Sequence, residues 1–389
     1  MDLGYGEGGK ITRPQTSLDG LAVARDGSVF LISVVTVSKY DPSGKLDPSF
    51  GAGGRVTTAG FASRPVVDEA GNVYLVVDDT VMKLDAAGRP VPSFGGNGIA
   101  RTGLWRVDGE GAILALLRAV DGGLFIVGTL PFKVGVAKLD ASGHLDPSFG
   151  SAGTLVFDAP GAADLGGAVD NAGNLYLAGT VRNFSAKYPV VWKIDSKGRV
   201  DMAFGDNGMW RGPACEGFMF LGRTPVAIAR DGGVVVATNC DSPTPGVVDR
   251  ALVFKIDRAG HTLTAFRTSG LRDGIFGAGP DGAESTPLIT DLVIAASGDI
   301  FVAGVRKGDL RSCQQFALAM LDPDGEPVTP FGSGGVLLDN ARSTIRVYVQ
   351  FDQAGRLYVA QSGEWPCPLG GVFRDPPARY EVNVYRLTS

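Results

Sequence analysis

Residues Leu46–Val56 read LDPSFGAGGRV, and recognisable copies of this stretch recur along the whole chain of 389 residues. Four more full copies keep the order of apolar residue, turn, aromatic residue and glycines: Val91–Gly98, Leu145–Gly153, Val200–Gly208 and Val328–Gly335. Two further copies are altered: Leu263–Phe266 is shortened, and Asp2–Ile11, which opens the chain, has Tyr5 at the aromatic position. Seven occurrences in one chain indicate a repeat architecture.

The repeat has a measurable period, because every copy except the first follows an apolar run that ends in aspartate. These aspartates are Asp41, Asp85, Asp140, Asp195, Asp257 and Asp322, whose successive differences are 44, 55, 55, 62 and 65 residues. Within a period, runs such as Val73–Val77 and Leu175–Ala178 are rich in β-branched and aromatic residues and end at turn residues, as strands do. No amphipathic helical pattern competes with them. Periods of this length are typical of a solenoid or a propeller blade.

One unit contains four expected strands: Gly20–Ala24, Val29–Ser33, Thr36–Tyr40 and Arg55–Thr58. Four antiparallel strands per unit are typical of a propeller blade, so seven units predict an all-β, seven-bladed propeller. We expect the motif phenylalanine to pack between neighbouring blades. The glycines after it would supply positive φ or close backbone approach.

The two ends of the chain are expected to close the ring. The seventh unit stops after three strands, whereas the chain begins with a motif that no strand precedes. Pairing Tyr5–Thr12 beside Glu381–Leu387 would complete the last blade and hide an unpaired sheet edge. Residues 1–389 are therefore expected to form one propeller domain.

The repeat resembles the delta-sixty family of bacterial repeats, which are built on a Leu-Asp-Pro-Ser-Phe-Gly-x-x-Gly core. Nearly the whole chain carries the resemblance, although the copy in the fifth unit departs from it at Ala265–Thr268. The resemblance implies a β-propeller and supplies no activity that could be transferred.

Composition limits the classes of partner. The formal net charge is −5 with no basic run, which argues against a nucleic-acid footprint. No stretch approaches the roughly 18 apolar residues of a membrane span. We expect a monomer that binds a protein, a glycan or a small molecule.

The four cysteines lack the CxxC spacing of zinc or redox motifs. All four are expected in loops on one face, which predicts the disulfides Cys215–Cys240 and Cys313–Cys367. The first residues lack the basic and apolar regions of a signal peptide. We expect an extracellular, periplasmic or cell-surface protein, with a cytoplasmic protein as the alternative.

Catalytic and metal-binding signatures are weak. The two histidines, His144 and His261, both follow a turn glycine where other units carry Lys, Arg or Glu, so they are interpreted as solvated turn residues. Gly4–Lys10 imitates a phosphate-binding loop, but Ile11 replaces its Ser or Thr and no strand precedes it. The Asp322–Gly325 run is interpreted as a turn. We expect no metal and no cofactor.

Long insertions mark one face of the expected ring, the face of the loops that join strands b to c and blade to blade, which we call the long-loop face. The first hypothesis is a non-enzymatic binding or scaffold module, exported or surface-associated, that uses this face of blades four to seven. Its expected contacts are aromatic residues and arginines, the types that dominate interfaces: Trp105, Arg182, Arg306, Trp365, Arg374 and Tyr380.

The second hypothesis is an enzyme acting on a small metabolite or glycan through carboxylate, Tyr or Arg side chains at the mouth of the central channel. Its candidate carboxylates are Asp164, Glu284 and Asp291. A deep pocket enclosing two carboxyl groups with displaced pKa values would favour the enzyme, and a broad aromatic surface would favour binding.

Overall fold

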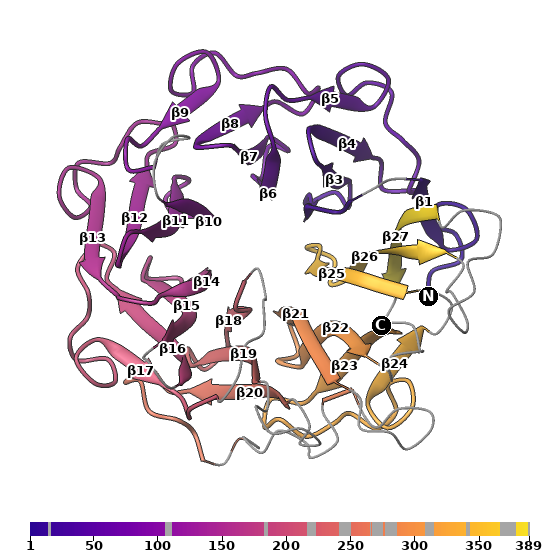
Figure 1. Cartoon of the computed structure of the whole chain (residues 1–389). Helices are drawn as coiled ribbons and strands as arrows, with labels where there is room; N and C mark the ends of the chain where they lie inside the picture. The colour runs from indigo at the N-terminus through magenta and orange to yellow at the C-terminus, as the bar shows by residue number, and fades with distance from the viewer. Residues whose placement is uncertain are drawn as a thin grey trace.

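Seven antiparallel sheets surround a central channel, so the predicted seven-bladed propeller is confirmed (Figure 1). The computed structural model describes residues 1–14, 17–105, 111–182, 186–215, 223–240, 250–264, 266, 275–276, 286–307, 315–339, 343–365 and 379–387. Within these residues no helix is long and apolar enough to span a membrane.

Six sheets have four strands, and the fifth has three within the part of the chain that the structure describes. The strands of each blade are given from the channel outward. Blade one contains β2 (Gly20–Val23), β3 (Val29–Ser33), β4 (Thr36–Tyr40) and β5 (Arg55–Thr57), and blade two contains β6 (Ala62–Val67), β7 (Val73–Val77), β8 (Thr80–Leu84) and β9 (Ile99–Arg101). Blade three contains β10 (Ala112–Arg118), β11 (Leu124–Leu130), β12 (Lys133–Leu139) and β13 (Thr154–Asp158), and blade four contains β14 (Ala163–Val169), β15 (Leu175–Arg182), β16 (Lys187–Ile194) and β17 (Met209–Arg211).

The remaining blades follow in the same order around the ring. They are β18 (Val226–Ile228), β19 (Val234–Cys240) and β20 (Arg250–Ile256); β21 (Thr286–Ile294), β22 (Ile300–Lys307), β23 (Gln315–Leu321) and β24 (Val336–Asp339); and β25 (Ser343–Phe351), β26 (Leu357–Trp365), β27 (Arg379–Leu387) and β1 (Lys10–Pro14).

The motif phenylalanine packs between blades, as predicted. Phe50 is fully buried and meets Phe30 of β3 edge to face, with ring centroids 5.6 Å apart. Both rings belong to a cluster that includes Val73 and Leu75 of the next blade. The same pairing recurs in other blades: Phe94 with Tyr74, Phe149 with Phe125, Phe204 with Tyr176, Phe331 with Phe301 and Tyr5 with Tyr358. The aromatic pair is therefore the repeated core unit.

The glycine after the phenylalanine forms a bond between blades that the sequence did not predict. The Gly51 N–H donates to the Ala87 carbonyl of the next blade at 2.8 Å. Gly51 has φ 57°, and a Cβ there would lie 2.2 Å from the Arg55 carbonyl oxygen. Gly88 in the accepting turn would bring a Cβ to 2.9 Å from the Gly51 nitrogen. Only two glycines allow this approach.

We call this hydrogen bond the inter-blade hook, and it repeats around much of the ring. The equivalent donors and acceptors are Gly6 and Ser43, Gly95 and Ser142, Gly150 and Lys197, and Gly205 and Ala259. Each hook joins a motif turn of one blade to a turn of the next blade and so helps to fix the distance between two neighbouring sheets.

The ring closes as predicted, with a later strand start. β1 pairs with β27 from Lys10 opposite Tyr385 to Pro14 opposite Glu381. The expected strand began at Tyr5, but Tyr5 is a buried motif aromatic, and the residues around it form turns. The residues around Tyr5 form the turns of the repeat motif, so pairing with β27 begins only at Lys10, after the motif glycines.

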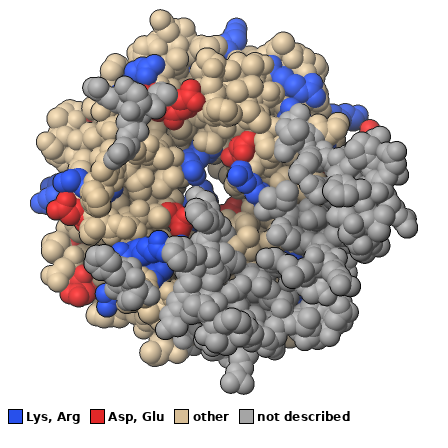
Figure 2. All heavy atoms as spheres, in the orientation of Figure 1, with Lys and Arg blue, Asp and Glu red and all other residues tan. Residues whose placement is uncertain are grey.

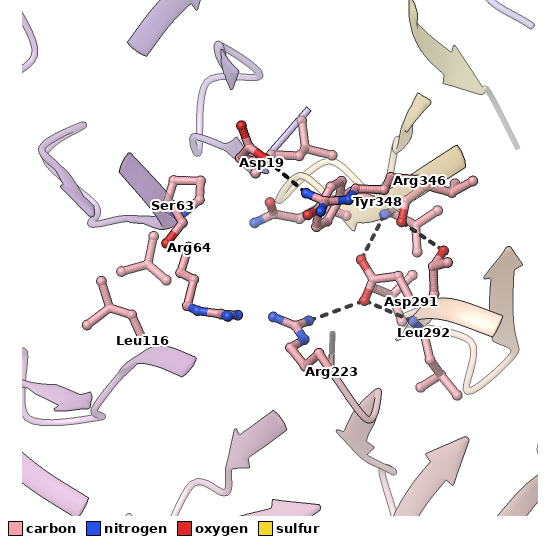
Figure 3. Close-up of a pocket in the computed structure, with 18 of the residues that line it drawn as sticks. Asp19, Ser63, Arg64, Leu116, Arg223, Asp291, Leu292, Arg346 and Tyr348 are labelled. Carbon is pink, nitrogen blue, oxygen red and sulfur yellow. Dashed lines mark hydrogen bonds and ion pairs between the residues drawn. The ribbon is translucent and has the colours of Figure 1, made fainter. Parts of the chain in front are cut away.

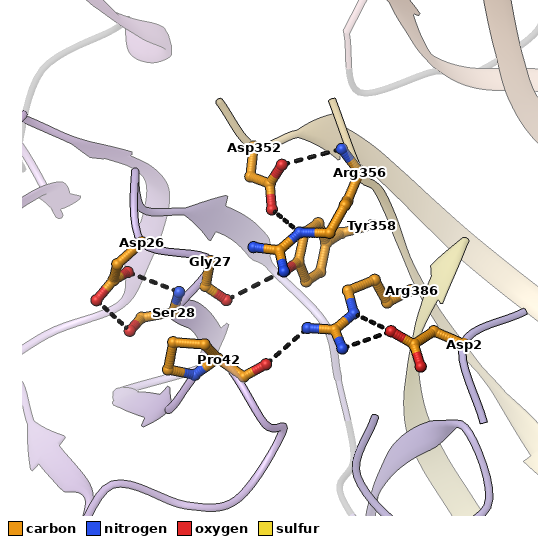
Figure 4. A network of polar contacts seen from close by, with 9 residues as sticks. All are labelled: Asp2, Asp26, Gly27, Ser28, Pro42, Asp352, Arg356, Tyr358 and Arg386. Carbon is orange, nitrogen blue, oxygen red and sulfur yellow. Dashed lines mark hydrogen bonds and ion pairs between the residues drawn. The ribbon is translucent and has the colours of Figure 1, made fainter. Parts of the chain in front are cut away.

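A polar network joins the last blade to the first (Figure 4). The Arg386 guanidinium donates to the Asp2 carboxylate at 2.9 Å and to the Pro42 carbonyl at 2.7 Å. The Tyr358 hydroxyl donates to the Gly27 carbonyl at 3.3 Å. These contacts cross the joint that the chain ends close.

The predicted disulfide Cys215–Cys240 is present, with a Cα–Cα distance of 5.0 Å. It ties the segment after β17 of blade four to the end of β19 of blade five, and both cysteines lie in one hydrophobic cluster. The predicted partners Cys313 and Cys367 lie outside the described residues.

Candidate functional site

The central channel holds a cavity of about 410 Å³, lined mainly by residues within the innermost strands (Figure 3). Asp19 and Arg223 precede their innermost strands, so the cavity also reaches toward the blade-to-blade loops of the long-loop face. Its polar lining comes from blades one, two, five, six and seven: Asp19, Arg64, Arg223, Asp291, Arg346 and Tyr348. Figure 2 views the molecule along the channel, with basic and acidic side chains around a central opening.

The positions of these residues follow from the repeat. Arg64, Asp291 and Tyr348 each stand seven residues before the glycine of the turn that follows their strand, namely Gly71, Gly298 and Gly355. Other blades have Gly20, Ala115, Gly166 and Pro225 at this position. Equivalent positions in seven blades form a ring around the channel, and in this chain the polar residues gather on one part of it.

Asp291 is the most deeply buried charged group of the cavity. Its carboxylate accepts the Val349 N–H of blade seven at 3.0 Å and its neighbour Leu292 N–H at 3.0 Å, and it pairs with the Arg223 guanidinium at 3.3 Å. Burial raises the pKa of the Asp291 carboxyl, and the Arg223 charge opposes that rise. Asp291 therefore joins blades six and seven and partly neutralises Arg223.

Arg346 forms a second ion pair at the cavity rim. Its guanidinium donates to the Asp19 carboxylate of blade one at 2.9 Å. The other Asp19 oxygen accepts the Ser17 hydroxyl at 2.7 Å and the Val34 N–H at 2.8 Å. This arginine thus already has a carboxylate partner.

Arg64 is the cation without such a partner. Its guanidinium donates to the Ile113 carbonyl at 3.3 Å, and among the described residues no carboxylate lies within ion-pair distance of it. Burial above all, together with the charges of Arg223 and Arg346, lowers the pKa of Arg64 to about 10. The guanidinium lies deep in the channel, although part of its surface remains open to the lumen.

Arg64 and Arg223 point toward one another across the cavity (Figure 3). Arg64 stands at a β-bulge between Ser63 and Val66 with φ 54°, an unusual backbone for a residue other than glycine. The bulge directs the long side chain across the channel. Three guanidinium groups and two carboxylates line the cavity, so an anion between Arg64 and Arg223 would balance its charge.

Tyr348 adds a hydroxyl to the same wall. Burial raises the pKa of the Tyr348 phenol, which the neighbouring arginines partly offset. The side chain is therefore a neutral hydrogen-bonding group at ordinary pH.

The structure places the predicted carboxylates differently. Asp291 lines the cavity, whereas Asp164 is not among its lining residues and pairs with Lys187 at 2.8 Å. Glu284 lies outside the described residues. The expected pair of carboxyl groups with displaced pKa values is thus not assembled by Asp164 and Asp291.

The predicted aromatic and arginine contacts also fall at different sites. Trp105 is buried in the core between blades two and three, and its indole N–H donates to the Thr129 carbonyl at 3.1 Å. Arg306 is buried and donates to the Phe276 carbonyl at 3.4 Å. Both residues therefore hold loops on blades, and neither presents an open contact surface.

The other predicted contacts are less fully described. Arg182 is exposed at the end of β15. Trp365 and Tyr380 lie in paired segments of β26 and β27, with Tyr380 opposite Glu364. Arg374 lies outside the described residues. Of these residues only Arg182 has a described side chain, and it is not among the described residues that line the channel cavity.

The sequence reasoning missed Arg64, Arg223 and Arg346. It sought contacts in inserted loops, whereas these arginines stand in or just before the innermost strands. Aligning the strands on their turn glycines would have found them, because Arg223 and Arg346 both stand nine residues before Gly232 and Gly355.

No protein-family model and no curated protein sequence matches this chain. Among solved structures, Drosophila Semaphorin 2a matches with a TM-score of 0.50 at 8% identity, over 90% of this chain and 73% of that one. A protein of unknown function from Dyadobacter fermentans matches with a TM-score of 0.48 at 10% identity, over 99% and 100%.

A gluconolactonase from Xanthomonas campestris matches with a TM-score of 0.40 at 14% identity, over 95% of this chain and 87% of that one. At such identities the likeness shows the propeller fold alone, and the neighbours include both enzymes and proteins of unknown function. The resemblance to delta-sixty repeats stays a prediction.

Proposed function

We propose that this chain is a non-enzymatic binding propeller of the delta-sixty type that holds a small acidic ligand inside its central channel, reached from the long-loop face. One observation carries the proposal: the Arg64 guanidinium points at Arg223 and has no carboxylate partner among the described residues. A guanidinium offers five N–H donors in a planar fork that matches carboxylate and phosphate oxygens.

The burial of Arg64 supports an anionic ligand. Its lowered pKa reflects a cation held away from bulk water and beside two other guanidinium groups. An anion bound between Arg64 and Arg223 would offset this repulsion and occupy N–H donors that only the Ile113 carbonyl now engages on the Arg64 side. Charge-assisted hydrogen bonds of this kind contribute about 1.5 to 3 kcal/mol each.

The test is calorimetric titration of the full chain with acetate, succinate, sulfate and inorganic phosphate. Arg64→Gln should weaken binding of the best anion about tenfold or more, since it removes at least one charge-assisted hydrogen bond. Arg199→Gln is the matched control, because Arg199 lies on an exposed turn and pairs only with Asp195. Equal loss in both variants, or no binding of any anion, would overturn the proposal.

A reaction at the same place is the second candidate. The raised pKa of the Asp291 carboxyl, inside a cavity that also holds Tyr348, favours it. However, both Asp291 oxygens already accept backbone N–H groups. An enzyme would convert the bound ligand, and Asp291→Asn would abolish turnover while binding persists; unchanged ligand recovered after long incubation would leave binding alone.

We also propose an oxidising location, outside the cytoplasm. The disulfide Cys215–Cys240 supports it, since such bonds persist in oxidising compartments. Fractionation of the native source, with the thiol content of the isolated protein measured after denaturation, tests the location.

A further inference from the structure

The wall of the channel beyond the arginines is aliphatic. In blades four, five and six the residues five and four positions before the turn glycine are Ala168, Val169, Ala227, Ile228, Val293 and Ile294. All six are partly exposed and line a second cavity of about 990 Å³. All but Ala168 pack partly against the hydrophobic clusters between the blades. Their exposed parts leave apolar surface in contact with water, which an apolar ligand would cover.

The two cavities adjoin. Leu292 and Val293 of β21 line both of them. The chain of blade five runs along both as well, because Arg223 lines the first cavity and Val226 to Ala229 line the second. At roughly 3.3 Å per residue, Ala229 stands up to about 20 Å along the channel from Arg223.

The far end of the second cavity is polar, but its charges are largely engaged. Lys193 pairs with Asp201 at 2.8 Å, and Arg258 donates to the Asp231 carbonyl at 2.8 Å. Arg230 is exposed there, so water can solvate it. Arg64, which has no carboxylate partner among the described residues, lies in the first cavity, at the other end.

We infer that the ligand is an amphipathic acid with an aliphatic chain, its acidic head between Arg64 and Arg223 and its chain along β14, β18 and β21. This inference rests on the proposed function and specifies the body of the ligand. The positive charge of Arg64 and Arg223 determines the acidic head group, and the aliphatic residues of β14, β18 and β21 determine the apolar chain. A head with one negative charge suffices, because the cavity carries one cation in excess.

The experiment titrates the full chain with straight-chain monocarboxylic acids from acetate to decanoate, below the concentration at which they form micelles. Each methylene buried against the aliphatic wall should raise the affinity about fourfold. Decanol tests the need for the charge, and decyl sulfate tests whether the head must be a carboxylate. Decanoate should bind far more tightly than decanol.

Two variants separate head from tail. Ala168→Phe fills the aliphatic part of the channel, so decanoate should lose affinity at least tenfold while butyrate keeps its own. Ala52→Phe, at an exposed turn residue, is the matched control for the substitution. Arg64→Gln should weaken all the acids by a similar factor, and Arg230→Gln should change none.

The failures can be told apart. If acetate binds as tightly as decanoate and Ala168→Phe has no effect, the amphipathic ligand is wrong and the acidic site stands. If decanol binds as tightly as decanoate and Arg64→Gln leaves both affinities unchanged, the proposal of an acidic-ligand site is itself wrong. Loss of decanoate binding in Arg230→Gln alone would reverse the orientation and overturn the inference.

Discussion

Asp291 competes with any anion for Arg223, because its carboxylate lies 3.3 Å from that guanidinium. The sequence named Asp291 as a channel carboxylate, and the structure places it in the cavity. Arg64 was not predicted from the sequence, because no residue pattern in one strand shows that a bulge will turn the side chain across the channel. The bulge depends on how Ser63 and Val66 pair with β7, which is a property of two strands.

Asp291→Asn should therefore strengthen binding of the anion. Removing the competing charge frees Arg223, with a gain of up to about 1 kcal/mol, or roughly fivefold. Titration of wild type and variant with the same acid measures the change. A weaker anion complex in Asp291→Asn would mean that the carboxylate takes part in binding.

The same variant should change how stability depends on pH. The folded-state pKa of Asp291 is raised, so its contribution to stability is fully present below the ordinary pKa of about 4 and is lost as pH rises through the folded value. The free energy of unfolding of the wild type, minus that of Asp291→Asn, should fall from pH 4 upward. Denaturant unfolding at several pH values measures this difference, and a difference that rises with pH would contradict the direction of the pKa shift.

At the scale of elements, the motif packs an aromatic ring between blades and forms the inter-blade hook. The sequence predicted the packing but not the hook. The packing of Phe50 between blades follows from an apolar aromatic residue at a fixed place in every repeat. The hook from Gly51 to Ala87 does not, because the donor and the acceptor lie in different repeats and positive φ alone does not name a partner. The exact start of β1 was missed for a similar reason: the motif turn around Tyr5 displaced the pairing.

Two glycines of one motif provide a test of the hook. Gly51→Ala should destabilise the protein by about 2 kcal/mol or more, since the new Cβ meets the Arg55 carbonyl at 2.2 Å and strains the donor. Gly53→Ala is the matched control, with a similar φ of 59° and no heavy atom within 4 Å of the added Cβ. It should cost only about 1 kcal/mol. Equal losses in thermal unfolding would assign the whole effect to backbone conformation.

The disulfide can be tested at the same scale. The Cys215→Ser, Cys240→Ser double variant should lose about 3 kcal/mol of unfolding free energy, because the bond closes a segment with a sequence separation of 25 residues. Reduction of the wild type should lower its stability to that of the double variant. An unchanged midpoint in denaturant after both treatments would mean that the bond adds nothing to the packed cysteines.

For the whole molecule, closure by the chain ends was predictable from the count of strands alone. The polar contacts across the joint were not, since Arg386 and Asp2 are neighbours only after the ring has closed. The sequence predicted a central channel and placed Asp291 near its mouth, but it did not predict the cavity that Arg64, Arg223 and Arg346 line. Seven inner strands meet at the channel, and no single repeat contains that information.

Removal of residues 1–14 should open the last blade. It deletes β1, exposes the edge of β27 and removes the Asp2 partner of Arg386. We expect a lower melting temperature and association through the exposed edge, measured by calorimetry and light scattering. Asp2→Ala removes the ion pair with Arg386 and the hydrogen bond from the Gly4 N–H but keeps β1, so it should leave the protein monodisperse. Aggregation of this variant as well would trace the effect to the polar joint.

The inter-blade hook also bears on how such a chain can grow. At five junctions among the described residues, one repeat supplies the donor glycine and the next repeat supplies the acceptor turn, so a tandem duplication of the gene copies both halves together. The new blade would arrive able to join its neighbours before any other residue changed. The innermost strand has no part in this bond, and it is free to diverge after duplication, which accounts for Arg64, Asp291 and Tyr348 at one repeat position. The motif turns keep neighbouring blades joined, whereas residues of the innermost strands can change and give the channel a new binding specificity.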